Sequence, residues 1–331
     1  TYTGDLKWET TSQFNVGVDL SLFNNRLRMT ADYYRKKTTD LLNNVEMPRS
    51  SGYTTALRNI GSIRNSGFEL QLDGRIIDRA VKWDLGVNFS LNRSKVLVLS
   101  EDKDIFGGEL DNTILKDQLN LMRVGEPMYV FYGYVEDGYD ENGHIVYKNM
   151  DDDPAITAAD KTIIGDPNPD FLVNLTTAVS YKGFTLSAFF QSSIGNDIYS
   201  LSMAAQAYDY GYNGNTLREV YYNHWTPENP TAKYPNLDQT SYKMSDRFVY
   251  DGSFVRLKNL ELAYDVPCAR SKFIKRARVY VSAQNLFTIT SYPFWDPDIN
   301  ANGGGSSMIQ GVDSYCYPSA RTYTIGCRLT F

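Results

Sequence analysis

Few residues of this sequence have the types and spacing that catalysis needs. The only histidines are His144 and His224, and both lie in polar stretches without strand or helix periodicity. A Ser-His-Asp triad or a zinc site needs a histidine held beside its partners, so two isolated histidines give little support to either. The 39 acidic residues guarantee some pair at glycosidase spacing, and such a pair is therefore uninformative. We predict that the protein is not an enzyme.

One acidic stretch, NMDDDPAITAAD, has the spacing of a calcium-binding loop. Aligned with an EF-hand loop, it places oxygen ligands at Asn149, Asp151, Asp153, the carbonyl group of Ala155, and Asp160. Two positions depart from that pattern, because Pro154 stands where the turn needs glycine and Asp160 replaces a bidentate glutamate. A structural calcium ion is one interpretation, and an acidic, solvated loop is the other. We predict no other cofactor.

Aromatic and acidic residues gather in two long polar stretches, 195–252 and 290–319. Aromatic ring faces pack on sugar rings and on peptide side chains alike, so these stretches favour an oligomeric ligand without choosing between the two. The candidate substrate contacts are Trp225, Tyr222, Trp295, Asp296 and Asp298. The alternative is that these side chains pack the loops together or face a partner protein.

Charge and apolar runs exclude two classes of protein. The formal net charge of -6 argues against a nucleic-acid surface, since phosphate binding needs clustered lysine and arginine. No run approaches the roughly 20 apolar residues that a membrane-spanning helix requires. The sequence has 25 Tyr and 24 Gly, together with abundant Thr, Ser and Asn, and this composition favours strands and turns. We expect an all-β fold.

Strict apolar-polar alternation recurs along the chain and predicts about eleven strands. The clearest case is 81–91, where Val, Trp, Leu, Val, Phe and Leu alternate with polar residues or glycine. The phase slips near Lys258-Asn259, as a β-bulge would cause. The predicted strands are 13–22, 27–33, 68–73, 81–91, 114–123, 128–138, 170–181, 184–194, 253–266, 277–289 and 320–331.

The connections between these segments alternate between short and long, so all long ones lie at one end of the sheet. That rule is typical of an antiparallel up-and-down transmembrane β-barrel with short periplasmic turns and long external loops. A soluble β-sandwich is the alternative. In the barrel, one face of the last strand meets lipid and carries Tyr323, Ile325, Cys327, Leu329 and Phe331, while Arg328 faces the lumen.

An odd number of strands does not close into an antiparallel barrel by itself. We therefore expect residues 1–331 to form the C-terminal part of a larger barrel, with the start at Thr1 cut and the end at Phe331 genuine. The three cysteines give no disulfide framework, and we expect free thiols.

Eight stretches, in order along the chain, resemble the SusC/RagA-like TonB-dependent outer-membrane transporters of Bacteroidota. They are LKWETTSQFNVGVDLSLFNNRL, DYYRKKTTDLL, NIGSIRNSGFEL, VGEPMYVFYGYVEDG, DKTIIGDPNPDF, DGSFVRLKNLELAY, VYVSAQNLFTITSYPFWDPDI and the terminal strand. The resemblance spans nearly the whole chain, and the ordered set is more specific than any single stretch.

The resemblance implies a barrel of about 22 strands whose lumen holds an N-terminal plug. It implies location in the Gram-negative outer membrane, a SusD-like surface lipoprotein as a lid, and import of glycans or peptides with force from TonB, ExbB and ExbD. The plug and the TonB box are absent from this chain. Two alternatives stay open: a soluble, secreted β-rich glycan-binding module, and a passive porin or adhesin barrel.

Overall fold

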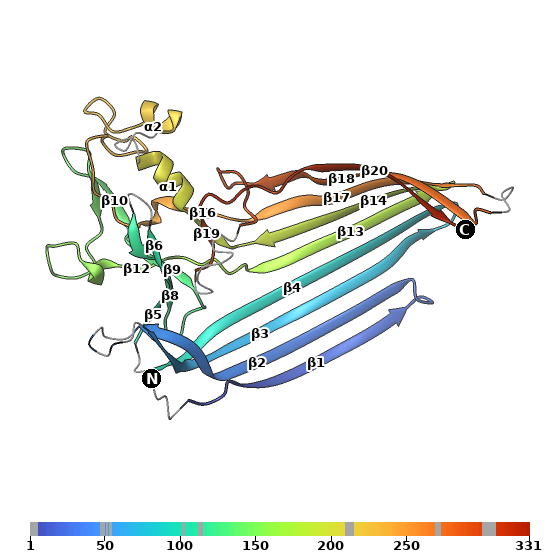
Figure 1. Ribbon diagram of the computed structural model, residues 1–331, viewed down its shortest axis with the longest axis horizontal. Coiled ribbons are helices and arrows are strands. Elements are labelled where there is room, and N and C mark those ends of the chain that lie inside the picture. Colours follow the sequence, from blue (N-terminus) through green and yellow to red (C-terminus); the bar gives the residue numbers. More distant parts are fainter. Residues whose placement is uncertain are drawn as a thin grey trace.

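The computed structural model describes residues 6–46, 50, 52, 55–100, 103–111, 115–208, 215–268, 273–299 and 309–331. Its main feature is a wall of nine long strands, each antiparallel to its neighbours, in the order β1-β2-β3-β4-β13-β14-β17-β18-β20 (Figure 1). The strands are β1 (Thr10–Leu22), β2 (Leu27–Glu46), β3 (Thr55–Asp78), β4 (Val81–Leu99), β13 (Phe171–Tyr181), β14 (Phe184–Ile194), β17 (Phe254–Val266), β18 (Arg276–Thr290) and β20 (Thr322–Thr330).

The all-β prediction is confirmed, but two of the eleven predicted strands do not join this wall. Of the predicted segments 114–123 and 128–138, the described residues form only short strands, β7 (Lys116–Gln118), β8 (Asn120–Met122), β9 (Val130–Gly133) and β10 (Glu136–Tyr139). Leu119, Leu121 and Phe131 are fully buried. Their alternation therefore reflects a small packed core, which an apolar-polar pattern cannot distinguish from a lipid-facing strand.

The predicted rule holds for the largest connections of the wall, because 100–170, 195–253 and 291–321 all lie at one end. The connections at the other end are 23–26, 79–80, 182–183 and 267–275. The exception is 47–54, which lies at the end of the long connections but is shorter than 267–275, because β2 and β3 continue far beyond β1. Lys182 and Gly183 have φ of 46° and 85°, as a tight two-residue hairpin requires. The bulge that the sequence predicts in β17 is also present, because the register shifts between Leu257 and Asn259.

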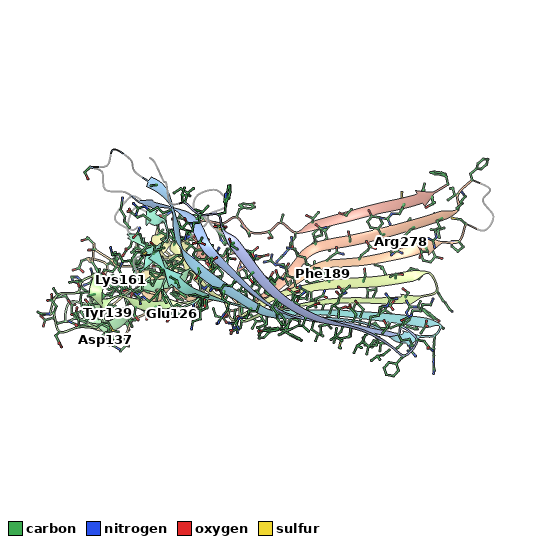
Figure 2. All side chains as sticks on the ribbon, turned by 90° about the horizontal axis from the view of Figure 1, so that it is seen from below. Glu126, Asp137, Tyr139, Lys161, Phe189 and Arg278 are labelled. Carbon is green, nitrogen blue, oxygen red and sulfur yellow. The ribbon has the colours of Figure 1, made fainter. Side chains whose placement is uncertain are left out.

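The long connections build a packed outer part at one end of the wall (Figure 1). Its further elements are β5 (Ile105–Phe106), β6 (Glu109–Asp111), β11 (Ile145–Tyr147), β12 (Thr162–Gly165), β15 (Asp197–Ser200), α1 (Leu201–Tyr208), α2 (Arg218–Tyr222), β16 (Val249–Asp251) and β19 (Val312–Asp313), with 3-10 turns at Ala158–Asp160 and Asp246–Phe248. Phe131, Tyr199, Tyr234 and Phe248 lie in its core. Figure 2 shows Tyr139 and Lys161 in this outer part, and Phe189 and Arg278 on the wall.

The helices of the outer part are short. Among the described residues, no helix has the length and apolar character that crossing a membrane would require.

Candidate functional site

The wall has one apolar face, which runs unbroken through register pairs across its strands. Residues that pair across antiparallel strands project to the same side of the sheet. Leu186 pairs with Leu262, Leu262 with Val281, and Val281 with Ile325. At the other edge of the wall, Val16 pairs with Tyr33 and Tyr33 with Phe68. These large side chains are exposed, with Leu262 at 45% and Val281 at 46% on inner strands of the wall, so this face has no protein cover among the described residues.

The opposite face is polar along the same strands. Gln71 pairs with Asn88, Asn88 with Asn174, and Asn174 with Gln191. A sheet with one mainly apolar and one mainly polar face fits a wall between hydrocarbon and water. The predicted terminal set lies on the apolar side: Tyr323, Ile325, Cys327, Leu329 and Phe331 are all exposed. Arg328 has the opposite parity and lies on the polar side, paired with Arg278. Contact of the terminal set with lipid stays a prediction.

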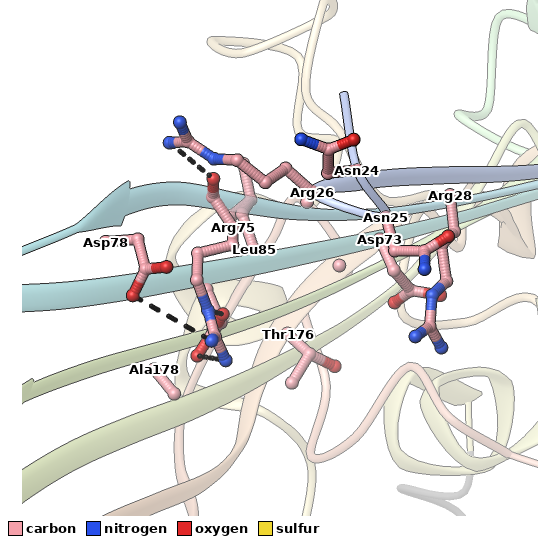
Figure 3. A pocket seen from close by; sticks show the side chains of 13 residues that line it. Asn24, Asn25, Arg26, Arg28, Asp73, Arg75, Asp78, Leu85, Thr176 and Ala178 are labelled. Atoms are coloured by element: carbon pink, nitrogen blue, oxygen red, sulfur yellow. Dashed lines mark hydrogen bonds and ion pairs between the residues drawn. The ribbon is translucent and has the colours of Figure 1, made fainter. Parts of the chain in front are cut away.

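Charged side chains gather on the polar face near the short turns, around a hollow of about 560 Å³ (Figure 3). The guanidinium group of Arg75 lies 2.8 Å from the Asp84 carboxylate and 3.9 Å from that of Asp78. Arg26 donates to the carbonyl oxygens of Arg75 and Ile76. These contacts join the turn between β1 and β2 to β3, and β3 to β4. The hollow is therefore polar, and its charges are partly neutralised by one another.

The predicted substrate contacts fall into two groups. Tyr222, at the end of α2, is 75% exposed, and its ring makes an edge contact with Tyr221. Trp225 is half-buried and packs over the backbone of Gly143, where a side chain would collide with the indole ring. α2 lies in the outer part, away from the wall (Figure 1). The second group lies where the connection from β18 to β20 leaves the wall.

The second group is organised by Arg256, a residue of β17 that is 1% exposed. Its guanidinium group forms a very short ion pair with Asp296, lies 3.3 Å from an Asp298 oxygen, and donates to the hydroxyl of Thr288 at 2.9 Å. Asp296 also accepts hydrogen bonds from the backbone N–H groups of Asp298 and Ser319. Arg256 and Asp296 together therefore hold the first part of the connection from β18 to β20, at Asp298, and its last part, at Ser319, against the wall.

The role of Asp296 in this arrangement is structural, because both of its carboxylate oxygens accept hydrogen bonds from within the chain. Burial acts to raise its pKa, but the Ser319 and Asp298 N–H groups and the Arg256 cation outweigh burial and hold the pKa below its usual value. Trp295 beside it is 58% exposed and stacks on Phe294. Trp295 is thus open to solvent beside the buried Asp296. Its contact with a substrate stays a prediction.

The loop 149–160 is closed by its own hydrogen bonds. The oxygens of Asp160, which is fully buried, accept the N–H groups of Met150 and Thr157 at 2.7 Å each, and these bonds lower its pKa. Side-chain oxygens of Asn149, Asp151 and Asp153 each accept an N–H group two residues along the chain. No group of three or more His, Cys, Asp or Glu placed to hold a metal ion occurs among the described residues.

Sequence analysis did not identify the ion pairs that hold the outer part together. Arg247 binds both carboxylate oxygens of Glu136, and Lys161 lies 2.6 Å from Asp117. The partners are 111 and 44 residues apart. No local pattern relates charges at such separations, so only the folded outer part reveals them.

Three comparisons with known proteins agree with this geometry. A family model described as "TonB dependent receptor-like, beta-barrel" matches residues 1–286. TonB-dependent receptor P3 of Formosa agariphila is 34% identical, over 99% of this chain and 34% of its own length. TonB-dependent receptor SusC of Bacteroides thetaiotaomicron is 29% identical over the whole of this chain and 33% of its own length.

Among solved structures, the RagAB peptide transporter superposes with a TM-score of 0.83 at 29% identity, over 99% of this chain and 36% of that one. The chain spans about a third of the length of the curated relatives it matches, which explains why its wall is open. The chain therefore belongs to the TonB-dependent receptor β-barrel family and is of the SusC/RagA-like type.

Proposed function

We propose that the protein containing this chain imports an oligomeric nutrient across the outer membrane, driven by TonB with ExbB and ExbD. The observation that carries the proposal is the two-faced wall, whose long connections all fold into one packed outer part. Family membership supports the outer-membrane location. In this proposal the chain supplies the C-terminal part of the barrel, while contact with TonB belongs to an N-terminal plug outside it.

We propose oligopeptides as the first class of cargo. The support is the similarity to the RagAB peptide transporter at 29% identity over 99% of this chain. Oligosaccharides are the second candidate, because Tyr222 and Trp295 expose ring faces to solvent and such faces stack on sugar rings. The two classes compete for the same external surface, so one uptake experiment can compare them.

A SusD-like surface lipoprotein is the partner that we propose as a lid. It would cover the outer part, where α2 presents Tyr221 and Tyr222 at 62% and 75% exposure. Exposed aromatic pairs are enriched at protein interfaces. This assignment is an alternative to direct substrate contact by the same rings, and co-purification of the lipoprotein with a Y221S/Y222S variant distinguishes the two.

The experiment that tests the function measures uptake of labelled oligopeptides and oligosaccharides by cells that carry or lack the full-length gene. We expect uptake of one class, lost on deletion of the gene and lost again when TonB is removed. Uptake that survives removal of TonB would indicate a passive porin. Recovery of the full-length protein in the soluble fraction without detergent would contradict a membrane barrel and favour a soluble binding module.

A further inference from the structure

The apolar face of the wall is hollowed at one place near its short turns. The hollow has a volume of about 540 Å³ and an almost wholly apolar lining drawn from β14, β17, β18 and β20. The side chains that shape it are Phe184, Leu262, Val279, Val281, Ile325 and Cys327. It lies toward the end of the wall where the chain terminates (Figure 1).

The strand register places a small side chain among large ones at this hollow of the apolar face. Val279 pairs with Cys327, and the neighbouring row joins Val281 to Ile325. The small thiol of Cys327 therefore stands among bulky aliphatic groups. The result is a trough at Cys327, flanked by larger side chains.

Two lysines lie in the short turns at this end of the wall. Lys182 lies in the turn directly before Phe184, and its ammonium group is 5.2 Å from the Tyr181 ring. Lys275 is exposed, and its backbone N–H donates to the Thr330 carbonyl at 2.7 Å, which places it beside the end of β20. Neither lysine forms a salt bridge with any residue that the structure describes. Both ammonium groups are thus available to an external anion.

We propose that this trough binds one acyl chain of a phospholipid whose anionic headgroup lies against Lys182 and Lys275. The proposal rests on the outer-membrane placement proposed above, since the trough is continuous with the apolar face that would meet lipid. An acyl chain matches the apolar lining, and a phosphate-bearing headgroup matches the two lysines. Because hydrocarbon burial and charge attraction act together at the trough, it should bind a lipid more strongly than the flat parts of the face do.

The experiment uses the full-length protein with Cys327 as its single cysteine, labelled with bimane and reconstituted in phosphatidylcholine vesicles. All three cysteines of this chain are free thiols, so replacing Cys268 and Cys316 by serine breaks no disulfide within it. A small fixed fraction of the lipid is either brominated phosphatidylglycerol or brominated phosphatidylcholine, and bromine quenches the label on contact. The control carries the label at Leu20→Cys, which lies on the apolar face of β1 three residues before the first short turn.

At Cys327 we expect brominated phosphatidylglycerol to bind about fivefold more strongly than brominated phosphatidylcholine for each lysine engaged. Lys182→Gln should remove about fivefold of that preference, and the two lipids should quench the Leu20→Cys label equally. Because Lys182 is in an exposed turn, the variant should fold, and its gel mobility without heating checks this.

Equal quenching by the two lipids at Cys327 would overturn the lipid site while leaving the membrane placement intact. Quenching at Leu20→Cys but not at Cys327 would also overturn it, because another protein surface, such as a second copy of the chain, would then cover the trough. Absence of quenching at both positions would overturn the membrane placement together with the proposal.

Discussion

A lysine placed on the apolar face of β20 should destabilise the protein far more than a lysine one residue away. Ile325 lies near the middle of β20 and shares a row of the apolar face with Val281 and Leu262, so its side chain is directed into the predicted lipid layer. Thr324 has the opposite parity and pairs with Ser282 on the polar face. The two positions share backbone, strand and depth, so they differ only in the medium that each side chain meets.

The expected cost of Ile325→Lys is about 2–4 kcal/mol, the value for a lysine on the lipid face at the membrane midplane. No described carboxylate lies on this face beside Ile325 to offset the charge, because its register partner is Val281. The cost of Thr324→Lys is about 0–1 kcal/mol, because the ammonium group stays hydrated in the lumen. The first value lowers the folded-to-unfolded ratio by roughly 30- to 900-fold.

The assay is folding of the full-length protein into phospholipid vesicles, read as the fraction that migrates as folded barrel on unheated gels across a urea series. Ile325→Leu serves as the matched control for repacking and should unfold close to the natural protein. A shifted urea midpoint for Ile325→Lys alone supports lipid contact. Equal shifts for the two lysine variants, or a larger one for Thr324→Lys, would refute the assignment of the faces.

Three further outcomes follow from the packing. Arg256→Met leaves Asp296 buried without its cation and should cost about 3–5 kcal/mol, read as a lower Tm. Because the folded pKa of Asp296 is depressed, its stabilisation is complete above about pH 4 and is lost as pH falls through the folded pKa, so the two proteins should converge in acid. Gly326→Ala should cost about 1–3 kcal/mol, since its Cβ would meet the Tyr280 ring at 2.4 Å, and Tyr280→Ala should restore stability. Adding calcium should leave the Tm unchanged if the hydrogen bonds to Asp160 persist. A rise in Tm on adding calcium, absent in the Asp153→Asn variant, would instead establish the predicted calcium site.

The faces of the wall were predictable from sequence because a strand places alternate residues on opposite sides, whatever the rest of the chain does. The order of Tyr323, Ile325 and Leu329 on one side and Arg328 on the other follows from that rule alone. The outer parts of β2 and β3 were not predicted. There the register shifts near Asp40 and Gly61 interrupt the alternation that identifies a strand.

The outer part was beyond sequence reasoning for a different reason. Its core and ion pairs join residues of separate connections, as Arg247 joins Glu136 across 111 residues, and no local period records such contacts. The same limit applies to the candidate site. The sequence identified Trp295 and Asp296 as neighbours in an aromatic loop. It did not show that Asp296 is buried while Trp295 is exposed, because the burial of Asp296 depends on its ion pair with Arg256, forty residues earlier.

The lipid-facing wall is tested most directly by a cysteine scan of 322–330 in the full-length protein on intact outer membranes, using a charged, membrane-impermeant thiol reagent. We expect alternating reactivity: residues on the parity of Thr324 should label from the aqueous lumen, and residues on the parity of Ile325 should be protected by lipid. Uniform labelling along the strand, or protection on the Thr324 parity instead, would contradict a lipid-facing wall.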